Sequence, residues 1–261
     1  MEDVHFRYSD EGPEILKGVN FCVEQGCALG LMGPVGAGKT TLLALMAGLF
    51  PPGAGRILLK PYRKNAHPVM MLQDPEAQFF LPTVREEISF SCRNAGMRAD
   101  PDFIRGIMAE AGLSPDLLER SPFSISGGEQ RRLSLAVLIA LRPRLLLLDE
   151  PDAGLDSQGL DALSDTLNGL KKTGLGLIIA SHNADFLYRI VDDYLFLRDG
   201  SLTGSPRTSL ADRAEYFKEI GVELPQVLAL QLLLKKEGFS GLPAARSAGE
   251  LISYLRSLTN P

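Results

Sequence analysis

The sequence lacks several features that would point at once to a class of function. Its three cysteines, Cys22, Cys27 and Cys92, form no C-x-x-C pair, which argues against a disulfide framework and against a zinc site built from cysteines. Its net charge of -5 gives no overall basic field, and we expect no nucleic-acid partner. We expect no signal peptide, and no apolar run approaches the roughly 20 residues of a membrane-spanning helix. Any role at a membrane is therefore expected to depend on a partner protein.

What the sequence contains is a set of short strand patterns within 261 residues, of which 45% are hydrophobic. Apolar and polar residues alternate at positions 4–8 and 19–23, which predicts half-buried strands of a small antiparallel sheet. Other runs are apolar throughout and predict strands covered on both faces, as in a parallel sheet. These runs are Cys27–Met32, Val69–Leu72, Leu145–Leu148 and Leu177–Ala180.

Helix-start signals fill the stretch from Gln73 to Ile125 and predict a helical insertion. Thr83 has the spacing of a capping box, and Asp100 and Ser114 each stand before a proline. Farther along, Asp199-Gly200 predicts a hairpin with a primed turn, and the pattern after position 204 is helical again. We expect an α/β fold with a mostly parallel sheet, an antiparallel β subdomain and a helical subdomain at about 74–135. The main domain would cover 1–204 and a short helical extension 205–261.

A glycine-rich segment fills the pattern G-x-x-x-x-G-K-[ST] between an expected strand and an expected helix. Glycine allows backbone N–H groups to wrap closely around phosphate oxygens at a helix N-terminus. The lysine would add a charge between the outer phosphates, and the threonine hydroxyl would bind Mg²⁺. The segment therefore predicts a binding site for ATP with Mg²⁺. Its residues are Gly33, Pro34, Val35, Gly36, Ala37, Gly38, Lys39 and Thr40.

Two acidic residues, Asp149 and Glu150, follow the apolar run at Leu145–Leu148, at the edge where open α/β sheets bind ligands. Asp149 suits the surroundings of the magnesium ion, while Glu150 can reach an attacking water as a general base. An acidic turn after a strand is common by itself, and the phosphate loop upstream favours the catalytic interpretation.

The segment Ser126-Gly127-Gly128-Glu129 resembles the Leu-Ser-Gly-Gly-Gln signature of the ABC-type ATPases. A serine cap, two glycines and a helix dipole together make a second anion site. The resemblance implies a P-loop NTPase core of the ABC type from Val4 to about Gly204. It also implies that the signature binds the γ-phosphate held by the phosphate loop of a second subunit.

The same resemblance implies roles for further residues. Tyr8 would stack on adenine, Thr41 would help to hold ATP, and Gln73 would sense Mg²⁺ and water. Asp156 would contact the partner subunit, and His182 would contact the γ-phosphate. On this basis the chain is expected to hydrolyse ATP, with Glu150 as the base.

Several positions depart from the family pattern. Ile125 and Glu129 stand where the family usually has Leu and Gln, and Asp152 replaces a common Thr. Val35 occupies a position often held by Asn, in a loop that works through its backbone. Cys27 stands where a glutamate is common. The signature serine and both glycines are present, so we expect the nucleotide sandwich to form.

The segment Gln73–Phe80 resembles the Gln-x-Pro-x-x-Gln segment of the energy-coupling-factor and cobalt-type importers, and Gly221–Val227 resembles a later one. The resemblance implies a peripheral subunit at the cytoplasmic face of the membrane. It would pair as a homodimer or with a paralogous ATPase, and it would bind an integral membrane scaffold. A separate substrate-binding membrane protein would select a vitamin or a transition-metal ion.

Three alternatives stay open at this point. In place of the expected importer subunit, the chain could be an ATPase of another ABC transporter type, a soluble ABC ATPase, or a nucleotide-gated interaction module without turnover. DNA-clamping members usually carry a very long coiled coil, whereas only about fifty residues separate Gln73 from Ile125. Glu150 and His182 argue against a module without turnover. The leucines after position 205 would serve dimer contacts or a small core.

Overall fold

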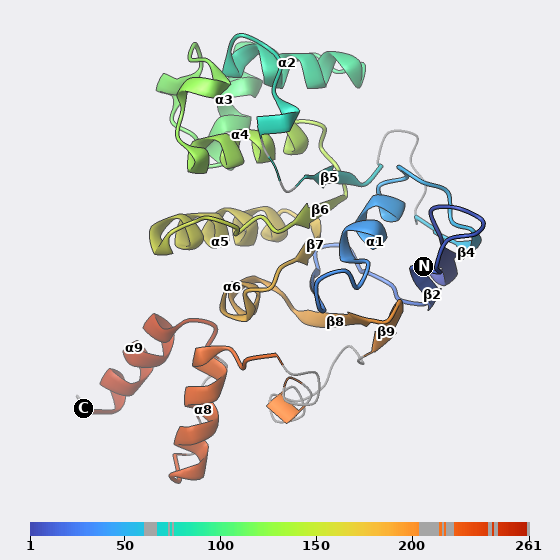
Figure 1. Ribbon diagram of the computed structural model, residues 1–261. Helices are drawn as coiled ribbons and strands as arrows, with labels where there is room; N and C mark the ends of the chain where they lie inside the picture. The colour runs from blue at the N-terminus through green and yellow to red at the C-terminus, as the bar shows by residue number, and fades with distance from the viewer. Residues whose placement is uncertain are drawn as a thin grey trace.

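The computed structural model describes residues 1–59, 67–72, 74, 76–203, 214–215, 217, 222–239, 242 and 245–259. A six-stranded sheet forms the centre, in the order β5-β6-β7-β3-β8-β9 (Figure 1). Every neighbouring pair is parallel except β8 and β9. The four predicted apolar runs are confirmed as strands. The bounds are β3 (Ala28–Met32), β5 (Val69–Met71), β6 (Leu145–Asp149), β7 (Gly176–Ala180), β8 (Asp193–Arg198) and β9 (Ser201–Thr203).

The antiparallel subdomain is a three-stranded sheet in the order β2-β1-β4. Its strands are β1 (Glu2–Phe6), β2 (Leu16–Val19) and β4 (Ala54–Arg56). The strand predicted at 19–23 is wrong, because β2 ends at Val19. Phe21 and Val23 lie outside the strand and pack, half-buried, against the core, so a rim of packed side chains produced the same alternation.

Two of the three helix starts predicted in the insertion, at Thr83 and Asp100, are confirmed. The bounds of the helices are α1 (Lys39–Met46), α2 (Val84–Asn94), α3 (Pro101–Glu110), α4 (Gly127–Ile139), α5 (Ser157–Lys172), α6 (Ala184–Ile190), α8 (Gln226–Lys236) and α9 (Ala248–Thr259). Thr83 and Asp100 cap α2 and α3 by accepting a backbone N–H. Ser114 caps only a short 3-10 turn, Pro115–Leu117, so the helix predicted to start there is wrong.

The central strands are buried on both faces, which explains their unbroken apolar character. In β6, Leu146 and Leu148 join the cluster that includes α4, α5 and α6, whereas Leu147 joins the cluster that includes α1 and the small sheet. Figure 1 accordingly shows α1 on one face of the sheet and α5 and α6 on the other. The helical subdomain of α2, α3 and α4 gathers beyond β5 at one end of the molecule.

The hairpin between β8 and β9 turns at Asp199 and Gly200, both with positive φ (51° and 83°), which confirms the primed turn. Past the hairpin, the described part of the extension contains α8 and α9. The N–H of Gln226 donates to Asp185 of α6 at 2.7 Å, and the Arg246 guanidinium donates to the carbonyl of Val191 at 2.7 Å. Among the residues that the structure describes, no helix is long and apolar enough to cross a membrane.

Candidate functional site

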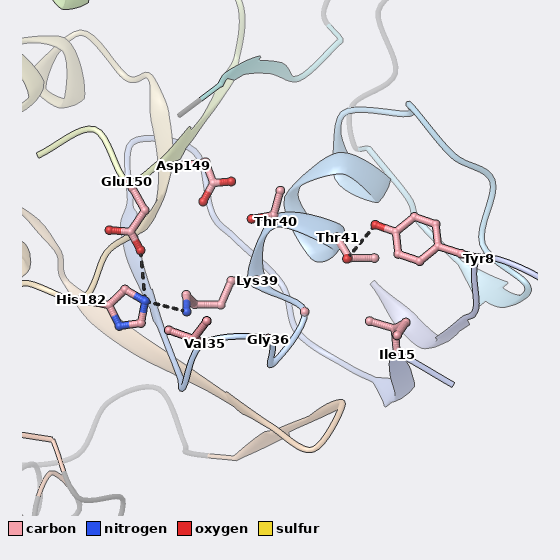
Figure 2. Close-up of a pocket in the computed structure, with 11 residues that line it drawn as sticks. Tyr8, Ile15, Val35, Gly36, Lys39, Thr40, Thr41, Asp149, Glu150 and His182 are labelled. Atoms are coloured by element: carbon pink, nitrogen blue, oxygen red, sulfur yellow. Dashed lines mark hydrogen bonds and ion pairs between the residues drawn. The ribbon is translucent and has the colours of Figure 1, made fainter. Parts of the chain in front are cut away.

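A cavity of about 570 Å³ lies at the carboxyl ends of β3 and β6 (Figure 2). It gathers residues that lie more than 170 positions apart, since Tyr8 and His182 both line it. Most of the predicted ATP ligands meet here. The lining residues are Tyr8, Ile15, Val35, Gly36, Gly38, Lys39, Thr40, Thr41, Asp149, Glu150 and His182.

The glycine-rich loop is shaped by contacts that exclude side chains. A Cβ at Gly33, whose φ is 150°, would lie 2.1 Å from the carbonyl oxygen of Leu197, so the first glycine is required by the adjacent strand. Gly38 has φ of 99° and stands directly before α1. No side chain caps α1, unlike α2 to α6, so the N–H groups of its first turn face the cavity without a side-chain acceptor.

The Lys39 ammonium binds to its own loop. It donates to the carbonyl oxygens of Gly33 at 2.9 Å and Pro34 at 3.2 Å, and it lies 3.1 Å from Nε2 of His182. Burial lowers the pKa of Lys39, an effect that the charges of Glu150 and Asp149 oppose. A phosphate that entered the loop would replace these carbonyl contacts with a full negative charge.

Glu150 and His182 approach each other across the cavity. Oε1 of Glu150 lies 3.3 Å from Nε2 of His182. The same nitrogen faces Lys39, and it cannot accept from an ammonium and donate to a carboxylate at the same time. Burial raises the pKa of the Glu150 carboxyl, with His182 lowering it and Asp152 raising it further. A ligand that draws Lys39 away would therefore leave Nε2 of His182 free to donate a hydrogen bond to Glu150.

Thr40 and Asp149 line the same cavity and offer one hydroxyl and one carboxylate. Among the described residues, no cluster of three or more His, Cys, Asp or Glu side chains could hold a metal alone. Mg²⁺ is commonly held by one or two protein oxygens together with substrate phosphates and waters, so this donor set fits that ion. Gln73, the third predicted ligand, lies outside the described residues.

Tyr8 lies at the far end of the cavity from His182 (Figure 2). It follows β1 and does not continue that strand, and 61% of its surface is exposed. Its hydroxyl is 2.9 Å from Oγ1 of Thr41, and its ring meets Phe6 and Phe50 edge-on at 5.0 and 5.6 Å. An exposed ring held at its edges offers a flat face, as stacking on a base requires.

The signature segment does not line this cavity. Ser126 caps α4 in a full capping box: its hydroxyl accepts from the Glu129 N–H at 3.4 Å, and its own N–H donates to Glu129 at 2.8 Å. The Ser126 hydroxyl also donates to Glu129 at 2.8 Å, and these hydrogen bonds lower the pKa of the Glu129 carboxyl. The departure from the family glutamine thus gives the helix an acid that occupies its own N-terminus.

Five further positions remain to be placed relative to the cavity: Asp156, Ile15, Gly33, Pro34 and Ala37. Asp156 is exposed and caps α5 by accepting the Gly159 N–H at 2.8 Å, so it has a local structural role in this chain. Ile15 lines the cavity and was not predicted, because an isoleucine before a strand carries no distinguishing signal. Gly33, Pro34 and Ala37 belong to the loop but not to the cavity lining.

The fold and the cavity place the chain in the class of P-loop nucleotide hydrolases, in which phosphate oxygens meet the uncapped start of a helix. A model of the family described as ABC transporter matches residues 16–153. The chain therefore belongs to the ABC transporter family, and it is an ABC-type ATPase.

Full-length relatives support this membership. The chain is 34% identical over 258 residues to the energy-coupling factor transporter ATP-binding protein EcfA2 of Symbiobacterium thermophilum, a match covering 93% of this chain and 89% of that protein. It is 32% identical over 284 residues to the protein of the same name from Caldanaerobacter subterraneus subsp. tengcongensis, covering 100% and 98%. The predicted resemblance to the energy-coupling-factor ATPases is confirmed.

Solved structures agree with the fold class. The structure of cbiO1 from Clostridium perfringens, described as part of the ABC transporter complex cbiONQ, aligns with a TM-score of 0.72 at 26% identity over 88% of this chain and 97% of that one. A dimeric ATP-binding cassette in a post-hydrolysis state, bound to ADP and Pi, aligns with a TM-score of 0.69 at 21% identity over 80% and 98%. The second likeness concerns the fold alone.

Proposed function

We propose that this chain powers an importer of the energy-coupling-factor type, and that two ATPase subunits close head-to-tail over ATP. Each nucleotide would lie between the phosphate loop of one subunit and the signature helix of the other. The relatives named above, an energy-coupling factor ATP-binding protein and a part of a cbiONQ complex, support this assignment. A vitamin or a transition-metal ion is the proposed class of cargo, selected by a separate membrane protein.

The signature glycines provide the observation on which the proposal rests. A Cβ built on Gly127 would meet nothing within 4 Å, and one on Gly128 would meet only Nη1 of Arg132, at 3.9 Å. The fold of the chain therefore has no steric need for glycine at these two helical positions, in contrast to Gly33. A ligand that approaches the helix N-terminus from outside does need the space, and the γ-phosphate of ATP on a partner subunit has the matching charge.

The proposed reaction uses groups that already face one another. Lys39 exchanges its loop carbonyls for the outer phosphates, and the uncapped N-terminus of α1 receives phosphate oxygens. A water oxygen attacks the γ-phosphorus, the bond to the bridging oxygen breaks, and Glu150 takes the proton of the water. His182 contacts the γ-phosphate and orients it. Mg²⁺, held by Thr40 and Asp149, would neutralise charge on the phosphates when bound.

Closure follows from the division of the site between two subunits. ATP binds the closed pair more tightly than the open pair, so it shifts the population toward closure, and hydrolysis removes this stabilisation. The dimer partner is either a second copy or a paralogous ATPase. An opening and closing motion of this kind is what a membrane partner can convert into transport.

The proposed docking site for the membrane scaffold is a set of exposed apolar side chains beside α4. Phe80 and Phe123 are 62% and 59% exposed. Both belong to segments fixed on α4, since Gln78 accepts from Ser134 at 2.8 Å and Pro122 accepts from Gln130 at 3.1 Å. A short amphipathic helix of the scaffold would cover these rings. The chain would then lie peripherally at the cytoplasmic face of the membrane.

Two measurements test the proposal. A Glu150→Gln variant should become dimeric with ATP and return to monomer with ADP, as measured by light scattering after gel filtration. The tagged wild-type chain should bring an integral membrane scaffold with it from detergent extracts. An ATP-dependent dimer with consistently no membrane partner would support the soluble alternative, and a strictly monomeric ATP-loaded variant, with cognate partners present, would refute the divided site.

A further inference from the structure

A buried carboxylate next to the catalytic turn has no partner for one of its oxygens. Asp152 follows Glu150 by two residues and is 9% exposed. Its carboxylate hydrogen-bonds to the Ser181 side chain, while Oδ1 lacks a hydrogen-bond partner among the described residues. Burial raises the pKa of this carboxyl, and Arg131 and His182 lower it. A buried carboxylate oxygen without a hydrogen-bond partner costs free energy, and a state of the protein that supplies a donor would recover it.

A complementary donor lies close by, on the signature helix. Arg131 is half-buried on α4, and its Nη1 donates to the carbonyl of Ala153, the residue next to Asp152. Its Nε is buried and also lacks a hydrogen-bond partner in the described part of the chain. Burial lowers the pKa of the Arg131 guanidinium, which the charge of Asp152 opposes. The two unpartnered atoms are thus a cationic donor on α4 and an anionic acceptor in the turn after β6. The guanidinium that carries the donor is already bound to the residue next to Asp152.

We propose that Arg131 and Asp152 pair when α4 moves toward the catalytic turn, and that the pair positions Glu150 and His182 for hydrolysis. The inference rests on the proposed closure over ATP, which brings the signature helix of each subunit against a nucleotide. In that movement Nε of Arg131 would donate to Oδ1 of Asp152, while Nη1 keeps its bond to the Ala153 carbonyl. In the present structure Nε of Arg131 and Oδ1 of Asp152 are not hydrogen-bonded to each other.

The path from this pair to the reacting groups is short. The Ser181 hydroxyl accepts the N–H of Asn183 at 2.9 Å, so its own hydrogen is left for Asp152. His182 lies between Ser181 and Asn183 in the sequence. If Arg131 fixes Asp152, the hydrogen bonds of Ser181 would therefore fix the residues before and after His182. The turn that carries Asp152 would also fix the backbone of Glu150, whose N–H donates to the Ala180 carbonyl at 2.9 Å. Arg131 and Asp152 are positioning residues in this scheme and touch no substrate.

A double-mutant cycle with Arg131→Gln and Asp152→Asn tests the proposal on the full-length chain. Each single variant should lower kcat for ATP hydrolysis roughly tenfold with little change in KM, and the double variant should lose no more than either single one. In the Glu150→Gln background, the same non-additivity should appear in the ATP concentration that drives dimerisation. Without nucleotide the changes in Tm should add, because the pair is not formed in that state.

Arg132→Gln is the matched control, because Nε of Arg132 is likewise buried without a partner but belongs to a neighbouring residue. Its effect should add to that of Asp152→Asn in every assay. Additive losses for Arg131 and Asp152 with ATP would overturn the proposal, and so would equal coupling with and without ATP, which would mean a static pair. If the wild-type chain neither hydrolyses ATP nor dimerises with it, the proposed function fails first, and this inference fails with it.

Discussion

Alanine at Gly128 should separate the stability of the chain from its ability to close over ATP. Gly128 is the second residue of α4, and a Cβ there would meet only Nη1 of Arg132, at 3.9 Å. In a helix, alanine is favoured over glycine by about 0.5–1 kcal/mol. For a chain of this size, the nucleotide-free Tm should therefore rise by roughly 1–4 °C. A stabilised chain is the opposite of what damage to the fold would give.

The same substitution should weaken the response to ATP. In the proposed dimer, the added Cβ would keep the γ-phosphate of the partner subunit's nucleotide away from the N–H groups of the first turn. Losing one hydrogen bond to a charged group is worth about 1.5–3 kcal/mol, or roughly 10- to 150-fold in the ATP concentration that drives dimerisation. The measurement is the dimer fraction against ATP concentration in the Glu150→Gln background, beside a thermal melt without nucleotide.

Gly106→Ala is the matched control. Gly106 is exposed in the middle of α3, and a Cβ there would meet nothing within 4 Å. It should raise the Tm by a similar amount and leave ATP-driven dimerisation unchanged. If Gly128→Ala dimerises at the wild-type ATP concentration, or if it lowers the Tm without nucleotide, the assignment of this helix end to a nucleotide is wrong.

Four further outcomes are expected. Glu150→Gln should reduce phosphate release at least about a hundredfold while ATP binding persists; unchanged turnover would support a binding module. Burial raises the pKa of Asp152 in the folded chain, so its contribution to stability is present below the ordinary aspartate pKa and is lost as pH rises through the raised value. Asp152→Asn should therefore gain Tm relative to wild type at neutral pH and lose that gain near about pH 4, and a pH-independent difference would contradict this sign. Phe80→Ser should lose the membrane scaffold in detergent while Leu233→Ser, a change of a similarly exposed side chain on α8, should not. Glu129→Gln should lower the ATP concentration for dimerisation about two- to fivefold at low salt, an effect that should shrink at high salt.

Sequence patterns were sufficient where a single physical requirement dominates. Strands covered on both faces must be apolar throughout, so β3, β6 and β7 could be read directly from the sequence. Alternation is weaker, because partly buried rim residues such as Phe21 give the same pattern without a strand. Ser114 before a proline marks a helix start, but no local signal shows that the helix continues for only one turn.

The candidate site shows a similar limit. The phosphate loop and Asp149-Glu150 could be placed together because a loop after one parallel strand and acids after another must meet at the same sheet edge. The contact of Arg131 with the Ala153 carbonyl had no such signal, since arginines on helices are common. Asp152 stood out only as a departure from the family threonine. Its burial beside Ser181 depends on how two loops pack, which local sequence does not encode.

The two helix ends of the proposed nucleotide sandwich differ in a way that sets an order of events. At α1 no side chain caps the N-terminus, so a phosphate meets unoccupied N–H groups and has only to displace Lys39 from two loop carbonyls. At α4 the N-terminus is already filled by Ser126 and Glu129, whose carboxylate repels an incoming phosphate until the capping box opens. ATP should therefore load each phosphate loop of the open subunits first. The signature end can follow only when the approach of the partner subunit stabilises the phosphate enough to exchange one anion for another. Closure is thus expected to be the slower step, and the charge at position 129 should control its rate more than it controls the initial binding of ATP.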